Sequence, residues 1–393
     1  MAGEITLHQA LSIPVINRVI SQVKTPLDAF QRRLGQTVGS EGATERVDRD
    51  AVSWDIFNVT RTMAKLRPRT AGPSRTSEKP FGMNSATLVR LHDSLHLLQD
   101  KIFKTRDLGQ GFDSPVDVTG QAYIARQLSF LKRRFSNSRE FMLSRMFRNG
   151  FGVKFTNEDM SLVESDDADA AFTVDYKIPA SNLGGSAFTM GGSSPIIDIP
   201  WDDPSANIPD HLYAINRNMM RLNGYELTEY WMNSATFTKI QQNNYLASIA
   251  GSSNTVFTSI GKDETLKGDD ANAQTGYSVR FRALPLHVFH IYDGVLSTSE
   301  SSPDSTTEAN TSMFLPTGKV LGHPMPSSDW VGYAAGSEIV AESYVDPGKH
   351  VQGFHVWKNR TILPPGWDLI AVDNYLPILY VPSTVVYFTA YTP

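Results

Sequence analysis

The stretch from Asp117 to Gly150, DVTGQAYIARQLSFLKRRFSNSREFMLSRMFRNG, constrains the fold more than any other part of the chain. Apolar residues recur at the spacing of one helical face: Ile124, Leu128, Leu131, Phe135, Met142 and Met146. Basic residues occupy the remaining positions: Arg126, Lys132, Arg133, Arg134, Arg139, Arg145 and Arg148. About thirty helical residues at roughly 1.5 Å each form a rod of about 45 Å, longer than a compact domain usually contains. We expect one long basic amphipathic helix that supports neighbouring elements.

The composition excludes several classes of protein. With 393 residues, 40% of them hydrophobic, the chain is long enough for two or three lobes with cores of their own. The absence of cysteine rules out disulfide bonds, thiolate metal sites and cysteine nucleophiles. No apolar run is long enough for a membrane span, and the start MAGEITLHQ has no secretory pattern. We therefore expect folding in a cytoplasm, with stability supplied by packing and assembly.

The net charge of −5 conceals an uneven distribution. Residues 1–150 carry 23 Lys and Arg against 14 Asp and Glu, whereas residues 151–393 carry 13 against 27. A basic part joined to an acidic part can bind polyanions, or can join copies of itself through complementary surfaces. Alternatively, the uneven charge has no binding role and these side chains are simply solvated. Runs of like charge are short, as in Lys132 to Arg134, which argues against a histone-like nucleic-acid binder.

Residues 1 to about 35 form a short apolar arm that Pro14 and Pro26 interrupt. Its apolar positions include Leu7, Leu11, Ile16, Val19, Ile20, Phe30 and Leu34. The arm is too short and too broken to fold alone, so its apolar side needs another surface. That surface belongs either to a second subunit or to the arm's own domain.

An extended excursion follows the polar linker at residues 36–50. The alternation from Val52 to Met63 predicts a strand, after which Leu66–Ala86 is rich in proline and glycine and offers little to bury. Leu88, Leu91, Leu95 and Leu98 then restore an apolar pattern at helical spacing. The basic residues of the loop are Arg67, Arg69, Arg75 and Lys79. We interpret residues 54–112 as an excursion whose basic tip suits the acidic surface of a neighbouring subunit.

The second half of the chain predicts an α+β lobe followed by strands. Pro209 stands at a first-turn position of a helix that ends at Gly224, and Asn233 or Ser234 caps a second helix after a strand-like Tyr225–Met232. From Tyr277 onward the pattern is β, interrupted by the acidic, Ser/Thr-rich segment from Ser297 to Ser312. We expect that segment to be a hairpin tip without core residues.

Motifs for catalysis, metals or nucleotides are absent from the sequence. His92 and His96 lie one helical turn apart but lack an acidic third ligand, and His287 and His290 should point to opposite faces of a strand. Asp202 and Asp203 beside Trp201 suggest a carboxylate pair for glycoside chemistry, although the loop before a helix explains them more simply. We predict no catalytic, metal or cofactor site and no enzymatic activity.

The order of the parts resembles the major capsid proteins of tailed phages with the Johnson (Hong Kong 97-like) fold, and most closely the lambda-type major capsid protein E family. The similarity rests on ITLHQALSIPVINRV in the arm, REFMLSRMFRNG at the end of the long helix, WDDPSANIPDHLYAINRN, YWMNSATFTKI, FHIYDG, MFLPTGKV, LPPGWDLI and LPILYVPS. These segments extend over nearly the whole chain.

This resemblance implies an α+β capsid fold with four parts. The parts are an N-terminal arm and linker (1–50), an E-loop (51–112), a P domain (113–175 and 336–378, with a spine helix at about 118–149) and an A domain (176–335 and 379–393). It also implies an interface between subunits that includes Leu7, Leu11, Ile16, Val19, Ile20, Phe30, Arg67, Arg69, Arg75, Lys79, Arg133, Arg134 and Arg139.

The implied function is self-assembly as hexamers and pentamers into an icosahedral head around double-stranded DNA. The expected partners are further copies of the chain, a portal, scaffolding and decoration proteins, and DNA contacted without sequence specificity. The expected location is the virion, after assembly in the host cytoplasm. Two alternatives stay open: an encapsulin-like or other shell protein, and a polysaccharide-binding or glycoside-hydrolysing β protein.

Overall fold

The computed structural model describes residues 28–38, 43, 45–47, 51–57, 82–98, 118–156, 159–184, 190, 195–249, 257–261, 276–281, 284, 286–297, 311–340, 349–361 and 366–393. Its helices are α3 (Ala29–Leu34), α5 (Val118–Met146), α6 (Ile208–Leu222), α7 (Ser234–Gln241) and α8 (Asn244–Ile249), with short 3-10 turns η1 (Ala180–Asn182) and η3 (Pro382–Thr384). Strands of five sheets complete the described part.

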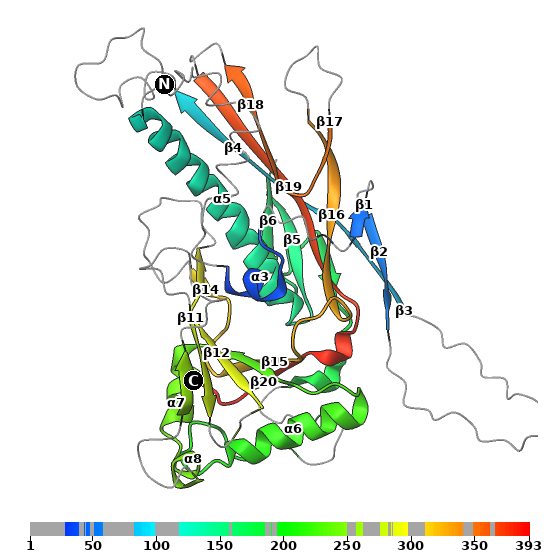
Figure 1. The fold of residues 1–393 in the computed structure, drawn as a ribbon. Helices are drawn as coiled ribbons and strands as arrows, with labels where there is room; N and C mark the ends of the chain where they lie inside the picture. The colour runs from blue at the N-terminus through cyan, green and yellow to red at the C-terminus, as the bar shows by residue number, and fades with distance from the viewer. Residues whose placement is uncertain are drawn as a thin grey trace, which may run out of the picture.

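The upper lobe in Figure 1 consists of a six-stranded sheet beside the long helix α5. Its strands are β1 (Glu45–Val47), β4 (Val89–Leu98), β16 (Val331–Val340), β17 (Lys349–Gln352), β18 (His355–Thr361) and β19 (Gly366–Leu379). The central strand β19 pairs antiparallel with β16, β18 and β4. Leu128 and Leu131 of α5 share a core cluster with Leu369 of β19, so helix and strand lie along each other.

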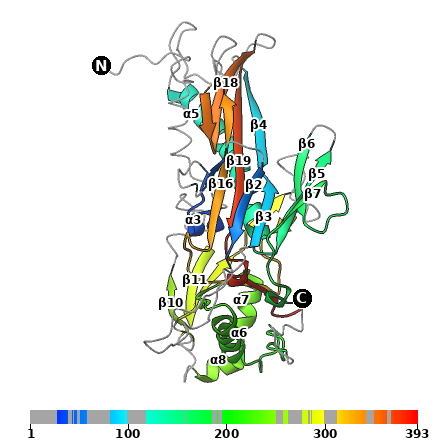
Figure 2. The ribbon, with the colours of Figure 1, turned by 90° about the vertical axis from the view of Figure 1, so that its right-hand side faces the viewer.

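The lower lobe contains a seven-stranded sheet that packs against α6 and α7 (Figure 2). Its strands, in spatial order, are β10 (Phe257–Gly261), β11 (Gly276–Phe281), β12 (Val288–Tyr292), β9 (Glu229–Met232), β15 (Lys319–His323), β20 (Val386–Thr389) and β8 (Leu183–Gly184). Strands β9 and β12 run parallel, and β9 and β15 run antiparallel. The chain therefore enters this lobe at β8 and returns to it with β20.

Three smaller sheets extend from the two lobes. The strands β5 (Gly150–Thr156), β6 (Asp159–Glu164) and β7 (Phe172–Asp175) form one, with β5 in the centre. The others are the pairs β2 (Ala51–Ile56) with β3 (Gly82–Thr87), and β13 (Val295–Ser297) with β14 (Thr311–Met313).

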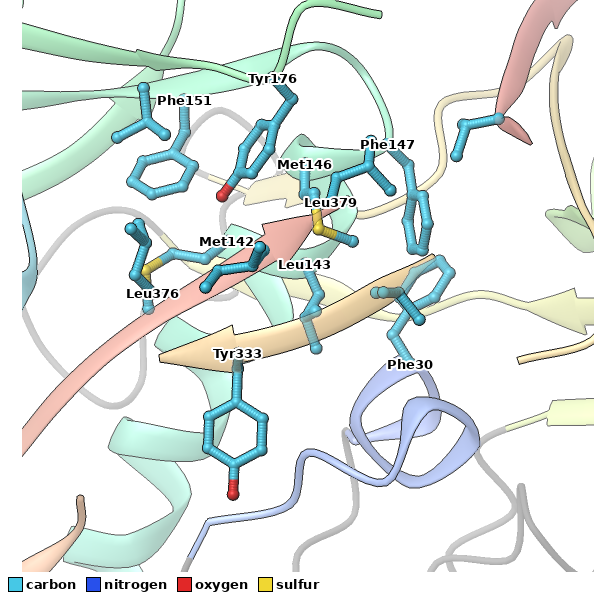
Figure 3. Close-up of a cluster of buried hydrophobic side chains, with 14 of the residues drawn as sticks. Phe30, Met142, Leu143, Met146, Phe147, Phe151, Tyr176, Tyr333, Leu376 and Leu379 are labelled. Atoms are coloured by element: carbon cyan, nitrogen blue, oxygen red, sulfur yellow. The ribbon is translucent and has the colours of Figure 1, made fainter. Parts of the chain in front are cut away.

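One hydrophobic core joins the end of α5 to both lobes. In Figure 3, Phe147, the residue after the end of α5, lies beside Phe30 of α3, and the two ring centroids are 5.8 Å apart. Phe30 also contacts Trp231 of β9, with 4.5 Å between the ring centroids. Because these aromatic side chains are buried, α3 is part of the interior of the subunit.

The long helix and both later helix starts are confirmed. Helix α5 extends from Val118 to Met146, and all six residues of the predicted apolar stripe are buried. Asn207 caps α6, accepting a hydrogen bond from the Asp210 amide, and Asn233 caps α7 in the same way through the Thr236 amide. The expected run of strands after Tyr277 is also present, from β11 to β20.

Two expectations from the sequence are wrong. The leucines from Leu88 to Leu98 lie on or beside the strand β4 instead of a helix, and exposed and partly buried residues alternate along it because one face packs on the lobe. The helix α5 also has no continuous basic face, since Lys132, Arg139 and Arg145 are buried. In the described part of the chain, no helix combines the length and the apolar character needed to cross a membrane.

Candidate assembly interface

The predicted interface residues fall into three groups. Nine of them, Leu7, Leu11, Ile16, Val19, Ile20, Arg67, Arg69, Arg75 and Lys79, lie outside the described residues. Arg133 and Arg134 are exposed on α5, and Arg134 contacts Asp93 of β4, Nη1 to Oδ2, at 3.0 Å. Phe30 and Arg139 are inside the subunit, where they contact residues of the same chain.

Arg139 is buried because it has a buried counter-charge. Its guanidinium group donates two hydrogen bonds to Asp373 of β19 and lies 4.3 Å from the centre of the Tyr375 ring. Burial alone would lower the pKa of Arg139, but Asp373 raises it, so the guanidinium stays charged. The same group donates to the carbonyl oxygens of Gln36 at 3.1 Å and Thr37 at 3.2 Å.

Glu140, the next residue of α5, binds the start of the segment whose end contacts Arg139. The carboxyl group of Glu140 accepts hydrogen bonds from the backbone amides of Phe30 at 2.8 Å and Gln31 at 3.2 Å. These amides belong to the first turn of α3, whose own N-cap residue Asp28 makes no side-chain cap. Glu140 thus supplies the acceptor that a helix start requires. We name residues 28–38 the anchor segment.

A second buried carboxylate fixes the anchor segment to the lower lobe. Arg33 of α3 forms two hydrogen bonds with Glu229 of β9, one of them from Nε at 2.9 Å. His290 of β12 lies 3.3 Å from the same carboxylate, measured from Nε2 to Oε2. Burial would raise the pKa of Glu229, but the hydrogen bonds from Arg33 and His290 lower it to about 2.

The anchor segment also reaches the upper sheet. Gln36 donates to the carbonyl oxygen of Gly332 in β16 at 3.1 Å and accepts from the Tyr375 hydroxyl of β19 at 2.5 Å. The eleven residues of the anchor segment are therefore joined to α5 and to both sheets.

Sequence reasoning missed the three buried carboxylates that make these contacts. Glu140, Glu229 and Asp373 are each at most 2% exposed. Glu140 and Glu229 stand at the start of apolar runs, in REFML and EYWM, and Asp373 stands within one, in IAVDNYL. An acidic residue in such a run predicts a buried partner, although it does not say which residue that partner is.

Several large apolar side chains remain exposed in the single chain. On the three-stranded sheet, Phe155 and Met160 are directly paired across β5 and β6 and are 52% and 57% exposed. The most exposed of the others are Met83, Met325, Leu286 and Ile339. Paired apolar side chains on a protruding sheet are typical of a surface that another chain covers.

The residues considered for chemistry have structural roles. Trp201 is fully buried and donates from Nε1 to Nδ1 of His211 at 3.2 Å, so it offers no platform for a sugar ring. The Asp203 carboxylate accepts hydrogen bonds from the amide and hydroxyl of Ser205, which closes the loop before α6. His92 and His96 lie on β4, and among the described residues no cluster of three or more His, Asp or Glu fits a metal ion.

Comparison with solved structures identifies the fold. The putative capsid protein of a prophage from E. coli CFT073 aligns with a TM-score of 0.50 and 12% sequence identity, over 79% of this chain and 79% of that chain. This chain shares the fold of that capsid protein. The expected α+β, Hong Kong 97-like capsid fold class is thereby confirmed.

Two further structures align over most of the chain. A phage-related protein from Bordetella bronchiseptica RB50 has a TM-score of 0.49 and 10% identity, over 97% of this chain and 98% of that one. The mature capsid of bacteriophage PhiM1 has a TM-score of 0.41 and 13% identity, over 89% and 86%. No protein-family model and no curated protein matches the sequence.

Proposed function

We propose that the chain is the major capsid protein of a tailed phage. It assembles as hexamers and pentamers into an icosahedral head around double-stranded DNA, and its role is structural, without catalysis. The observation that carries this proposal is the fold shared with a prophage capsid protein over 79% of both chains. The chemistry of the described residues supports it, since the buried carboxylates are used in contacts within the subunit.

The proposed division into A and P domains is supported by the two large sheets. In the six-stranded sheet, β17, β18 and nearly all of β19 fall in the proposed P domain with α5, and β16 crosses its boundary at residue 336. The other two strands of this sheet, β1 and β4, come from the proposed arm and E-loop. Strands β8, β15 and β20 belong to the seven-stranded sheet, which falls in the proposed A domain (176–335 and 379–393). The A domain then surrounds the local symmetry axes, and the P domain forms the subunit edges.

The contacts between subunits come from the arm and the E-loop in this proposal. The arm's apolar residues before Asp28 and the loop residues Arg67, Arg69, Arg75 and Lys79 overlap neighbouring subunits, and Arg133 and Arg134 add basic charge at the surface of α5. Each exposed ion pair contributes only about 0 to 1 kcal/mol, so strength comes from the number of repeated contacts. Phe30 and Arg139 are buried in the single chain, so in this proposal they hold the anchor segment instead of contacting a neighbour.

Electron microscopy of the purified recombinant protein, together with sedimentation velocity, tests the proposal. Closed shells or hexameric capsomers are the expected result. A stable monomer of 43.5 kDa under conditions that vary salt and protein concentration would contradict self-assembly. Nuclease-protected DNA in shells from infected cells, with a portal at one vertex, is the further expectation for a phage head. Shells that hold a cargo protein and no genome would instead support encapsulin-like use of the same fold.

A further inference from the structure

The apolar face of the three-stranded sheet continues beyond the core of its own subunit. On this face of β5, Phe151 and Val153 are buried, whereas Phe155, two residues further along, is 52% exposed. Met160 of β6 is paired with Phe155 and is 57% exposed, and the ring centroids of Phe155 and Phe172 of β7 are 6.5 Å apart. Because alternate strand residues share a face, the covered and uncovered side chains form one continuous apolar surface. We name its outer part, Phe155, Met160 and Phe172, the sheet tip.

The exposed side of α5 carries a second surface. Arg126, Phe130 and Arg133 follow one another at spacings of four and three residues, so they lie on one side of the helix. Phe130 is 51% exposed, and both arginines are exposed as well. The opposite side of the helix holds the buried apolar stripe. Aromatic and arginine side chains are enriched in interfaces between proteins. We name these three residues the spine stripe.

The elements that carry the two surfaces have opposite charge. Residues 157–169, which include β6 and the turn after it, contain six acidic and no basic residues, whereas residues 118–139 of α5 contain no acidic residue. The exposed acidic residues of the turn are Asp166, Asp167 and Asp169. Lys154 of β5 pairs with Asp169 and offsets one of these charges. The turn crosses the other face of the sheet, over Gly152, so its charges act on a neighbour through space. Such attraction extends over about 8 Å at physiological salt and favours the approach of the two surfaces.

The two surfaces lie on different sides of the subunit. In Figure 2 the three-stranded sheet projects from the right side of the upper lobe, and the start of α5 is visible at its left. The central side chains, Phe130, Phe155 and Met160, are each about half exposed in the single chain, so neither surface covers the other. We propose that the sheet tip of one subunit packs on the spine stripe of a neighbouring copy. Because the two surfaces differ, the contact is head-to-tail, and its repetition around an axis can close a ring such as a hexamer or pentamer. This inference rests on the proposed capsid function and assigns residues to one of its contacts.

A neighbouring copy fits the spine stripe better than DNA does. Phosphate contacts would use the arginines but would leave the apolar ring of Phe130 in water. An apolar partner surface removes that ring from water, and the sheet tip supplies such a surface with acidic residues close by. The spine stripe therefore matches a protein surface that is both apolar and acidic.

Crosslinking between introduced thiols tests the contact, since the protein has no cysteine of its own. Shells are assembled from a mixture of Phe130→Cys and Met160→Cys subunits, isolated by sedimentation and treated with a short bismaleimide. We expect a covalent dimer from the mixture and from neither variant alone, and a ladder of larger products from the double variant. In the control mixture, Met220→Cys, at an exposed methionine of α6, replaces Met160→Cys and should give no dimer.

The outcomes separate this contact from the capsid function. Shells that form without the dimer would overturn the contact and leave the capsid function standing, whereas subunits that never assemble would contradict the capsid function itself. A dimer from one variant alone, or a crosslink within one chain of the double variant, would also overturn the head-to-tail contact.

A double-mutant cycle measures the same contact without a reagent. Phe130→Ala and Met160→Ala should each raise the protein concentration needed for half-maximal shell yield by about three- to tenfold. The double variant should raise it by less than the product of the two single effects, because the two side chains contact each other. An effect equal to that product would refute the contact. If, in addition, Arg126→Gln with Arg133→Gln lowered the DNA retained in shells, the spine stripe would be a DNA-binding surface instead.

Discussion

Arg139 and Asp373 form a bidentate ion pair across 234 residues of sequence, with Nε to Oδ2 at 2.6 Å and Nη2 to Oδ1 at 2.7 Å. Both side chains are buried, at 2% and 0% exposed. The pair joins the C-terminal third of α5 to the central strand β19, and the same guanidinium donates hydrogen bonds to two carbonyl oxygens of the anchor segment.

Removing one partner of this pair should be more harmful than removing both. Asp373→Ala leaves a buried guanidinium without its counter-charge and should lower the free energy of unfolding by about 3 to 5 kcal/mol. The double variant Arg139→Met, Asp373→Ala should be more stable than Asp373→Ala alone, because no unpaired charge remains. Urea unfolding of four proteins measures this: the wild type, Asp373→Ala, Arg139→Met and the double variant. A loss in the double variant equal to the sum of the two single losses would contradict the coupling.

Gly150 should tolerate alanine far less well than Gly35 does. Both have positive φ, 144° and 70°, so strain alone does not separate them. A Cβ at Gly150 would lie 2.0 Å from the carbonyl oxygen of Val174 in the β5–β7 ladder, whereas nothing lies within 4 Å at Gly35. We expect a loss of about 1 to 2 kcal/mol for Gly35→Ala and about 3 kcal/mol or more for Gly150→Ala, measured by chemical unfolding.

Two truncations should separate assembly from folding. Deletion of residues 1–27 keeps the anchor segment and should leave the unfolding midpoint unchanged while closed shells fail to form. Deletion of residues 1–35 removes Phe30 and Arg33 and leaves Glu140 and Glu229 buried without these partners. This longer deletion should therefore destabilise the subunit itself. Equal unfolding midpoints for the two proteins would show that the anchor segment does not contribute to the fold.

Acid should weaken the contact between Arg33 and Glu229. The pKa of Glu229 is lowered from 4.5 to about 2, so its contribution to stability is present above pH 4.5 and is lost as the pH falls towards 2. A shift of this size corresponds to at most about 3 kcal/mol. Arg33→Met should reduce stability at pH 7 and flatten the stability change between pH 5 and pH 3. The same pH dependence in this variant and in the wild type would assign the effect to another group.

Charge reversal in the proposed E-loop should weaken shells. Replacing Arg67, Arg69 and Arg75 with glutamate removes attraction to acidic neighbours, and shell yield should fall further as salt screens the remaining contacts. Sedimentation at low and high salt measures the yield. Arg217→Glu, at an exposed position of α6, is a single-site control to compare with Arg67→Glu. A triple variant with the wild-type salt response would remove the E-loop from the proposed interface.

Local periodicity predicted the helices well because the apolar spacing and the capping residues that define a helix lie within the segment itself. The stripe from Ile124 to Met146 and the caps at Asn207 and Asn233 depend on residues a few positions apart. Strand β4 was misread because its leucines have helical spacing, while its real constraint is pairing with β19, where His96 lies opposite Asp368. No local pattern contains that distant partner.

From the sequence, Arg139 and Phe30 were assigned to a surface for the same physical reason: the residues that bury them are distant in the sequence. In the sequence, Arg139 resembles the other arginines of a basic helix. In the structure it is buried because it pairs with Asp373. Phe30 looks like one more apolar residue of the arm, but its neighbours are Trp231 of β9 and Phe147, just after the end of α5. The sequence alone predicted that the arm needs a partner surface, and it could not show that the last part of the arm finds one in its own subunit.

Helix α5 and strand β19 have a mechanical relationship as well as a packing one. At roughly 1.5 Å per helical residue and 3.3 Å per strand residue, both elements are about 45 Å long. They are joined by leucines and by the pair of Arg139, in the C-terminal third of α5, with Asp373, in the middle of β19. Bending the upper lobe in the plane that contains both elements must therefore stretch one of them while it compresses the other. Like the two flanges of a beam, helix and strand together resist bending in that plane.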